Sequence, residues 1–320
     1  LMLSGVPLKG PVSWVRVGHL DGELTLWPED ARMQESRLDL VIAGTAKSVT
    51  MVEAGAKQID EKTVLDAIDL GHQAVKQICD LQMQVLQELG LKPGTETWQP
   101  PEEEHADLLG KVRDGAKARV EEVIVQPSKP ARQQALKPIG EEMIERFGED
   151  PEQPAEGRYP VKAVKQAFRT VCDEVLRAMI LEGKRVDGRR PDEIRKIECE
   201  TSALPRTHGS ALFTRGETQA LVTATLGTGL DEQIVDGLQE EYKKRFMLHY
   251  NFPPFSVGEV RPLRGTSRRE LGHGNLAERA LESVLPDKEA FPYTLRLVSE
   301  ILMSNGSSSM ASVCGGTLAM

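Results

Sequence analysis

Long hydrophobic runs, secretion signals and paired cysteines are all missing from this sequence. No stretch of about 18 consecutive apolar residues occurs, so no segment has the length of a membrane-spanning helix. The opening residues lack the charged-then-apolar pattern of a secretion signal. We therefore expect a cytoplasmic protein without a membrane partner. The four cysteines, Cys79, Cys172, Cys199 and Cys314, are far apart and form no Cys-x-x-Cys pair, which favours reduced, buried thiols over a metal site.

A net positive charge is missing too. The formal net charge is -9, which excludes a chain that coats nucleic acid non-specifically, because such binding needs a broad basic face. A local basic channel is still compatible with this charge, since basic residues cluster at 243–245 and 261–269. The length of 320 residues is enough for two or three domains with cores of their own.

The N-terminal part is predicted to be a sheet covered by a helix. Asp21-Gly22 is typical of a two-residue hairpin turn. Asp60 can cap a helix that keeps apolar spacing until Gly90. Prolines and glycines at 93–101 indicate a linker and a domain boundary. The strand-like segments are residues 12–17, 24–27, 38–43 and 48–53.

The middle of the chain is predicted to be all helical. The acidic run at 102–104 fits a helix start, where the dipole favours negative charge. Nothing in this part indicates chemistry, and a connector with solvated faces is the favoured interpretation. Apolar stripes at helical spacing run through residues 108–123, 136–147 and 161–180.

Strand patterns return in the last third of the chain. Arg215-Gly216 is predicted to be a turn between two of them. Residues 227–265 are predicted to be a long irregular loop, and loops of this length are usually functional or disordered. The aromatic residues in the Tyr250-Asn251-Phe252 segment argue against disorder. The predicted strands are 194–200, 210–214 and 217–226.

Three consecutive serines, Ser307, Ser308 and Ser309, are the most informative stretch. Asn305-Gly306 before them permits a left-handed corner, and a serine N-cap can accept the free amides of a first helical turn. Amides, hydroxyls and the helix dipole then favour an anion such as phosphate. An ordinary polar cap would explain one serine, but three favour a phosphate site. Alternation over 293–298 predicts a strand before them. The helix after them is predicted to bury Met310, Val313, Cys314, Thr317 and Leu318.

A second candidate element begins at Ser267, which can form a Ser-x-x-Glu capping box with Glu270. The box places Arg268 and Arg269 in the first turn, where the dipole disfavours cations. Gly272 and Gly274 each cost about 1 kcal/mol relative to alanine in a helix. These choices fit a polyanion that approaches the backbone here, although solvent-facing arginines on a frayed helix start are the alternative. The predicted buried face is Leu271, Leu276, Ala280, Leu281 and Val284.

His273 lies between these two glycines. A lone histidine is more often structural than catalytic, so its position alone does not assign it a role.

These motifs resemble the polynucleotide phosphorylase family, which has ribonuclease PH-like cores. The last third of the chain looks like the second core of that enzyme. The resemblance implies an α/β (α+β) fold in which residues 1–95 are the C-terminal half of a first core. Residues 96–181 would be an all-helical connector, and residues 182–320 the N-terminal half of the second core. The segments that carry the likeness are 185–189, 204–219, 246–254, 268–274 and 305–315.

The resemblance also implies an activity and a site. The family performs 3′-to-5′ phosphorolysis of single-stranded RNA to nucleoside diphosphates, reversible as polymerisation, with inorganic phosphate as co-substrate. Carried onto this sequence, the serines of 307–309 would hold the phosphate, Arg268 and Arg269 would grip phosphates, and His273 would support the site. A homotrimer active in mRNA turnover is implied, with RNA-degradosome components as candidate partners.

The family uses magnesium, and the sequence leaves two alternatives to its activity open. Mg²⁺ is held by aspartates that follow the serine helix, so its ligands are expected beyond Met320 and no metal ligand is predicted within the chain. We interpret the chain as part of a longer enzyme, inactive as an isolated segment. A non-catalytic ring scaffold or RNA-binding subunit of the exosome type is the main alternative, although it needs neither the serines nor the arginines. A phosphate-independent hydrolase is the third.

Overall fold

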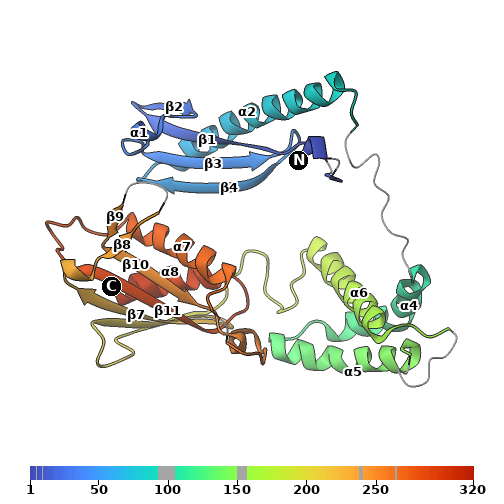
Figure 1. Ribbon diagram of the computed structural model, residues 1–320. Helices are drawn as coiled ribbons and strands as arrows, with labels where there is room; N and C mark the ends of the chain where they lie inside the picture. Colours follow the sequence, from blue (N-terminus) through green and yellow to red (C-terminus); the bar gives the residue numbers. More distant parts are fainter. Residues whose placement is uncertain (5, 9, 93–104, 150–156, 238–240, 264) are drawn as a thin grey trace. The chain divides into compact units, whose positions relative to one another are not determined.

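The chain divides into two compact units in a computed structural model, drawn in Figure 1. One unit comprises Leu1–Pro101 with Arg279–Asp287, and the other Glu102–Glu278 with Lys288–Met320. The predicted linker at 93–101 and the acidic run at 102–104 lie outside the described residues. The structure describes residues 1–4, 6–8, 10–92, 105–149, 157–237, 241–263 and 265–320.

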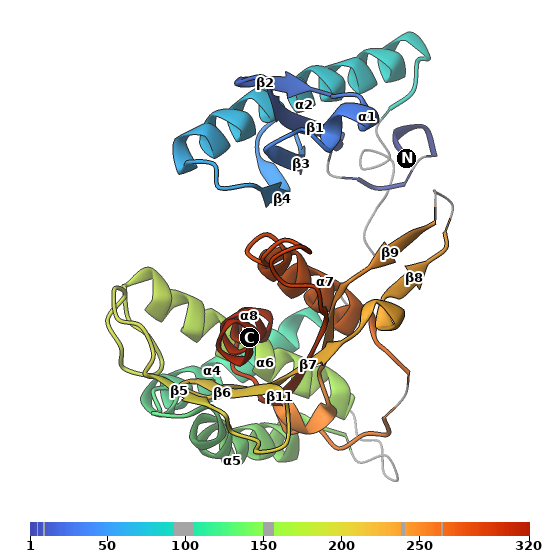
Figure 2. The same ribbon diagram turned by 90° about the vertical axis from the view of Figure 1, so that its left-hand side faces the viewer.

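The first unit is an antiparallel sheet with a helix on one face (Figures 1 and 2). All four predicted strands are present, in the order β2-β1-β3-β4. Asp21 and Gly22 both have positive φ, as the predicted two-residue turn requires. The elements are η1 (Met2–Ser4), β1 (Ser13–Leu20), β2 (Glu23–Leu26), α1 (Asp30–Met33), β3 (Leu38–Gly44), β4 (Val49–Ala56) and α2 (Glu61–Glu88).

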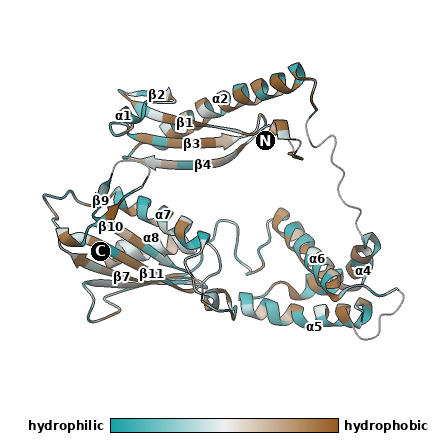
Figure 3. Cartoon of the chain, viewed as in Figure 1, coloured by the Kyte–Doolittle hydropathy of each residue, from teal (hydrophilic) through white to brown (hydrophobic). Residues whose placement is uncertain are grey.

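Helix α2 packs closely on β1 and β3. The Asp60 carboxylate accepts a hydrogen bond from the Thr63 amide at 2.8 Å, which confirms the predicted cap. Gly71 lies so near the sheet that an added Cβ would be 2.4 Å from Cδ1 of Ile42. Hydrophobic and hydrophilic residues alternate along α2 in Figure 3, as expected for a helix with one buried face. The core consists of Val15, Val17, Leu38, Leu40, Ile42, Ala67, Val75 and Cys79.

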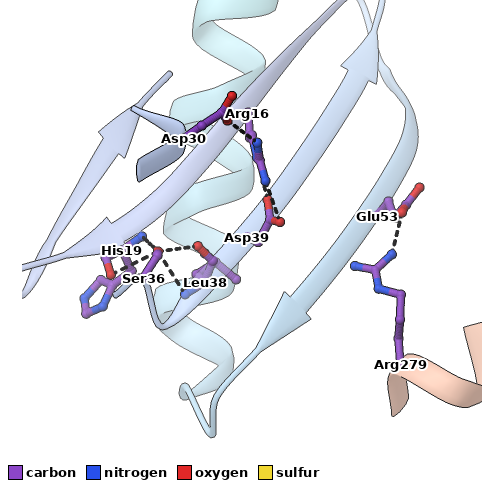
Figure 4. A network of polar contacts seen from close by, with 8 residues as sticks. All are labelled: Arg16, His19, Asp30, Ser36, Leu38, Asp39, Glu53 and Arg279. Atoms are coloured by element: carbon purple, nitrogen blue, oxygen red, sulfur yellow. Dashed lines mark hydrogen bonds and ion pairs between the residues drawn. The ribbon is translucent and has the colours of Figure 1, made fainter. Parts of the chain in front are cut away.

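Polar contacts tie neighbouring segments of this sheet together (Figure 4). The Arg16 guanidinium donates to both carboxylate oxygens of Asp39, at 2.8 and 2.9 Å, and to Asp30 at 3.0 Å. This hydrogen bonding with Arg16 lowers the pKa of Asp39. Ser36 accepts from the His19 amide and donates to the Leu38 carbonyl. The strand register is therefore fixed on the side away from the core as well.

The second unit contains a five-stranded sheet with the order β10-β11-β7-β6-β5. Strands β10 and β11 are parallel, and the other neighbouring pairs are antiparallel. The turn predicted at Arg215-Gly216 is confirmed between β6 and β7. The strands are β5 (Ile197–Thr201), β6 (Gly209–Arg215), β7 (Thr218–Gly227), β8 (Gln233–Val235), β9 (Tyr242–Lys244), β10 (Phe246–Asn251) and β11 (Thr294–Met303), with η2 (Gly229–Asp231) and η3 (Pro254–Val257).

The prediction of an irregular loop over 227–265 was wrong in part. This stretch contains the β8–β9 hairpin and strand β10. Phe246 of β10 pairs with Leu295 of β11, so the partner strand lies far away in the sequence. A parallel pair of this kind has no hairpin turn to reveal it.

Helix α8 (Ser308–Ala319) packs on β6, β7 and β11, but its buried face differs from the predicted one. Met310, Cys314 and Thr317 are exposed. An added Cβ on Gly315 would be 2.7 Å from Cγ2 of Val222. The helix therefore lies too close to the sheet for large side chains, and its small residues face inward. The buried residues are Ser308, Ser309, Ala311, Ser312, Gly315, Gly316 and Ala319.

Helix α7 (Arg268–Glu282) begins where the capping box predicted, but its predicted buried face was also largely wrong. Leu271 and Leu276 are exposed, whereas Ala277 and Glu278 are buried. The Glu278 carboxylate accepts a hydrogen bond from the Leu248 amide of β10 at 2.9 Å. The Glu278 carboxylate, a buried acceptor for the edge strand β10, thus replaces the expected apolar contact. Apolar spacing in the sequence cannot reveal such a contact.

The predicted helices of the middle segment are confirmed as α4 (Ala106–Val123), α5 (Lys129–Phe147) and α6 (Val161–Leu181). Ser128 caps α5, since its Oγ accepts from the Ala131 amide at 3.2 Å. Among the described residues, no helix is long and apolar enough to cross a membrane. The core of this segment contains Leu108, Val112, Ala116, Val120, Ile124, Ile139, Met143, Tyr159, Val164, Ala167, Val171 and Val175.

The expectation of buried thiols holds for Cys79 and is wrong for Cys199 and Cys314. Every residue of strand β5, an edge of its sheet, is exposed, including Cys199. Cys314 is on the face of α8 that points away from the sheet. Cys172 is half-buried, and burial raises the pKa of its thiol to about 11.

Candidate functional site

The serine turn joins β11 to α8 through a left-handed corner. Gly306 has φ 94° and Ser307 has φ 48° and ψ 49°. The predicted cap is not formed, since the Ser307 side chain makes no capping hydrogen bond. Such caps usually accompany an extended backbone at the N-cap, which Ser307 lacks. The first amides of a helix have no intrahelical partner. No described side chain caps the start of α8, so its amides are available to an anion.

The next two serines are buried rather than displayed. Ser308 is 4% exposed and Ser309 is 7% exposed. Oγ of Ser308 lies 2.6 Å from the hydroxyl of Tyr250. Burial raises the pKa of Tyr250, so the hydroxyl is protonated at neutral pH and can donate to the serine. The Ser308 hydroxyl is thus already engaged by Tyr250, whereas no side chain among the described residues caps the first amides of α8.

The start of α7 has the predicted capping box. Oγ of Ser267 accepts from the Glu270 amide at 3.2 Å, and the Glu270 carboxylate accepts from the Ser267 amide at 2.7 Å. The other carboxylate oxygen accepts from the Phe252 amide at 2.9 Å. Burial opposes ionisation of Glu270, but these hydrogen bonds outweigh it and lower the pKa. Glu270 therefore fixes α7 against the end of β10.

Arg268 and Arg269 are both exposed in the first turn of α7. The Arg269 guanidinium lies 4.7 Å from the centre of the Phe252 ring, within the range of a cation–π contact. Within the described ranges, no carboxylate forms an ion pair with either arginine. Both charges are consequently available to an anionic ligand, as the sequence predicted for a polyanion.

His273 lies beside Tyr250. Its ring centre lies 5.4 Å from that of Tyr250. Nδ1 of His273 is buried and has no hydrogen-bond partner among the described residues. Burial, and then the charge of Arg269, lowers the pKa of His273. The imidazole is therefore neutral at pH 7, and its unpaired nitrogen leaves polar capacity unused within the site.

Tyr250 connects these elements, and sequence reasoning did not assign it to the site. Its hydroxyl contacts Ser308, and its ring lies beside His273 and stacks on Phe252 at 6.1 Å, next to Arg269. The structure thus gathers Ser308, His273 and Arg269. Among the described residues, no side-chain contact joins Arg268, Ser307 or Ser309 to them. The sequence did contain a signal for this role of Tyr250, because aromatic residues follow an apolar segment there. That segment had been interpreted as part of a loop.

No metal site is present in the part of the chain that the structure describes. No group of three or more histidine, cysteine, aspartate or glutamate side chains could hold an ion there. The described residues consequently do not fit a resident metal.

Three protein-family models match the chain. Residues 193–320 match domain 1 of the 3′ exoribonuclease family, and residues 10–74 match domain 2. Residues 107–190 match the RNA-binding domain of polyribonucleotide nucleotidyltransferase. A fold of ribonuclease PH-like parts with a helical segment between them therefore defines the chain as a member of the 3′ exoribonuclease class.

Curated relatives narrow this class. The polyribonucleotide nucleotidyltransferases of Pseudothermotoga lettingae and Thermus thermophilus are each 48% identical to the whole chain, which covers 45% of each. The enzyme of Roseiflexus sp. is 50% identical, with 42% of it covered. The chain belongs to the polyribonucleotide nucleotidyltransferase (polynucleotide phosphorylase) family. It spans a little under half the length of these relatives.

Proposed function

We propose that the chain contributes the phosphate site of a phosphate-dependent 3′-to-5′ exoribonuclease that acts on single-stranded RNA. The single observation that carries the proposal is the convergence on Tyr250 of two helix starts. The uncapped start of α8 reaches Tyr250 through Ser308, and α7 reaches it through His273 and through Arg269, whose guanidinium lies over the Phe252 ring that stacks on Tyr250. Free helix-start amides and unpaired arginines are chemically suited to inorganic phosphate and an RNA phosphodiester. Family membership supports the same activity.

The proposed reaction is an in-line displacement. An oxygen of inorganic phosphate, held at the amides of Ser308 and Ser309, attacks the phosphorus of the terminal phosphodiester. The bond from that phosphorus to the 3′ oxygen of the preceding nucleotide breaks, which releases a nucleoside diphosphate and a shortened RNA with a 3′ hydroxyl. Arg268 and Arg269 offset the negative charge of the two reacting groups. The reverse reaction extends RNA.

His273 would support this site in its neutral form. Its ring packs on Tyr250, and its buried Nδ1 can donate or accept a hydrogen bond according to its tautomer. We assign it to positioning, since the lowered pKa disfavours a further positive charge beside Arg269.

Magnesium belongs to the proposal through family membership. When bound, Mg²⁺ would neutralise charge on the reacting phosphates. The described residues supply no cluster of ligands, so carboxylates from elsewhere in the enzyme would have to hold the ion.

The organisation of the enzyme is also part of the proposal. We assign residues 1–95 to the first core, 96–181 to the connector and 182–320 to the second core, in line with the extents of the three family models. A cytoplasmic homotrimer that takes part in mRNA turnover, with degradosome components as partners, follows from the family resemblance. Light scattering on the natural enzyme tests the trimer.

The reaction is tested by incubating the natural enzyme with single-stranded RNA, with and without inorganic phosphate. We expect RNA loss to require phosphate and to yield nucleoside diphosphates, identified by chromatography. Release of monophosphates without phosphate would instead support the hydrolase. Tight RNA binding without turnover, with Mg²⁺ supplied, would support the scaffold.

A further inference from the structure

The turn between β6 and β7 holds the backbone of the serine corner. Nη2 of Arg215 donates to the carbonyls of Gly306 and Ser307, at 2.8 and 3.3 Å. The buried Thr218 hydroxyl donates to the Gly306 carbonyl at 3.1 Å and accepts from the Asn305 amide at 3.0 Å. The Asn305 amide and the carbonyls of Gly306 and Ser307 are therefore all bonded by the same short hairpin, and the Ser307 carbonyl also accepts from the Ala311 amide at 3.2 Å.

Glu217 lies between these two residues and contacts a third part of the fold. One carboxylate oxygen accepts from the Asn305 side-chain amide at 2.9 Å and from the backbone amide of Lys129 at 3.0 Å. The second oxygen also faces the Lys129 amide, at 3.2 Å. Lys129 is the first residue of α5. A single half-buried carboxylate thus joins the start of α5 to the corner that precedes α8.

The chemistry of this junction requires an acceptor only. Both partners of Glu217 are N–H donors, and a carboxylate is the side-chain group that accepts on both of its oxygens. A negative charge also suits the amide end of α5. A glutamine has one accepting oxygen and no negative charge. If its oxygen took the shared position, its amide group would face the Lys129 amide, another donor, where the second carboxylate oxygen now lies at 3.2 Å.

The corner depends on such external support because its backbone is unfavourable in isolation. Ser307 is a non-glycine residue in the left-handed region, which persists in proteins when the surroundings hold it. The conformation of Ser307 sets where the first amides of α8 point. A residue that fixes the corner consequently fixes the anion site without touching the anion.

We propose that Glu217 is a positioning residue that sets the geometry of the phosphate site and makes it depend on the docking of α5. This inference rests on the proposed function, because it takes the ligand at α8 to be inorganic phosphate. It extends that function by linking the phosphate site to the segment that matches an RNA-binding domain. Loosening the start of α5 then weakens phosphate binding at α8.

Two variants test the link from its two ends. Glu217→Gln removes one accepting oxygen from the junction. Lys129→Pro removes the N–H donor from α5 and leaves the residues around the serine corner unchanged. Proline is tolerated at the first position of a helix, and Ser128 already has the extended backbone, φ -139° and ψ 156°, that a residue before proline prefers. Glu200→Gln, on the exposed edge strand β5, is the matched control.

Steady-state phosphorolysis by the natural enzyme is measured at varied phosphate with saturating RNA, and then at varied RNA. We expect both variants to raise the KM for phosphate at least threefold, with kcat and the KM for RNA within twofold of the wild type. The control should match the wild type. Thermal melting of each variant reports folding separately, and Lys129→Pro keeps the test valid if Glu217→Gln folds poorly.

An unchanged phosphate KM in both variants would overturn the proposal, even if their melting temperatures fell, because Glu217 would then be structural only. Equal losses in the use of phosphate and RNA would overturn it too. Failure of the proposed function gives a different result, since wild-type RNA loss would then not depend on phosphate at all.

Discussion

The hydroxyl of Tyr250, near the end of β10, lies 2.6 Å from Oγ of Ser308, the first residue of α8. Both oxygen atoms are buried, so each hydroxyl group satisfies the hydrogen bonding of the other. The contact joins two elements that also meet through the parallel pairing of β10 with β11, the strand that leads into α8. The start of the serine helix is thereby fixed by a side chain as well as by the sheet.

Tyr250→Phe is expected to destabilise the protein by about 1–3 kcal/mol, because it leaves the buried Ser308 hydroxyl without a partner. Urea unfolding measures this loss. Tyr242→Phe is the control, since Tyr242 is 56% exposed. Equal midpoints for Tyr250→Phe and the wild type would contradict a stabilising contact.

Arg269→Ala is expected to reduce phosphate-dependent RNA turnover by at least tenfold with little change in stability, because the exposed guanidinium has no carboxylate partner among the described residues. Turnover assays and thermal melting measure the two effects. Arg146→Ala is matched to it, since Arg146 lies 5.0 Å from the ring of Phe147 in the helical segment. Parallel losses in melting temperature and turnover would assign Arg269 to folding.

Stability is expected to fall as the pH drops below about 6.5. The pKa of His273 is lowered from 6.5 by burial and by Arg269, so the folded state binds fewer protons than the unfolded chain in that range. The loss begins near the unfolded pKa and levels off below the folded one. His273→Gln should flatten this dependence in urea midpoints between pH 7 and 5. An unchanged slope would contradict the assignment.

Part of the slope should persist in His273→Gln. The pKa of His249 is lowered as well, by burial and then by Arg296, so this second histidine contributes in the same direction. A double variant with His249→Gln is expected to be flatter than either single variant.

Gly272→Ala is expected to stabilise α7 by up to about 1 kcal/mol, because alanine favours a helix and nothing lies within 4 Å of the added Cβ. The sequence assigned this glycine to the approach of a polyanion, so RNA affinity should fall while stability rises. Filter binding and chemical unfolding measure the two. Higher stability with unchanged RNA affinity would assign Gly272 no role in binding.

Gly315→Ala is expected to destabilise the protein, in contrast to Gly272→Ala. Its Cβ would be 2.7 Å from Val222, so α8 would have to move off the sheet, at a cost of about 1–3 kcal/mol.

Local signals predicted most of the elements. The Asp21-Gly22 turn, the Asp60 cap and the Ser267–Glu270 box each involve residues close in sequence, and each forms as expected. Strand β10 was missed because its pairing partner, β11, follows only after helix α7. A pattern within one strand contains no information about such a partner.

The sequence named most residues of the candidate site, but it did not predict how they come together around Tyr250. The arginines were recognisable because the helix dipole disfavours cations in a first turn, and the serines because three of them follow one another. His273 was assigned only through the family resemblance. Tyr250 was missed because its strand was interpreted as a loop, in which its ring argued only against disorder. The inward face of α8 was predicted incorrectly because apolar spacing assumes that large side chains fill the interface, whereas Gly315 and Ser312 allow the helix to touch the sheet.

The hairpin between β6 and β7 also restricts how the length of the chain can vary. Surface turns usually tolerate inserted or deleted residues, because their tips touch little else. Here a single added residue near Gly216 would shift Arg215 relative to Thr218 and turn Glu217 away from both of its partners. This short connection is therefore a place where an insertion would act at a distance, on a helix whose first residue lies some ninety positions later.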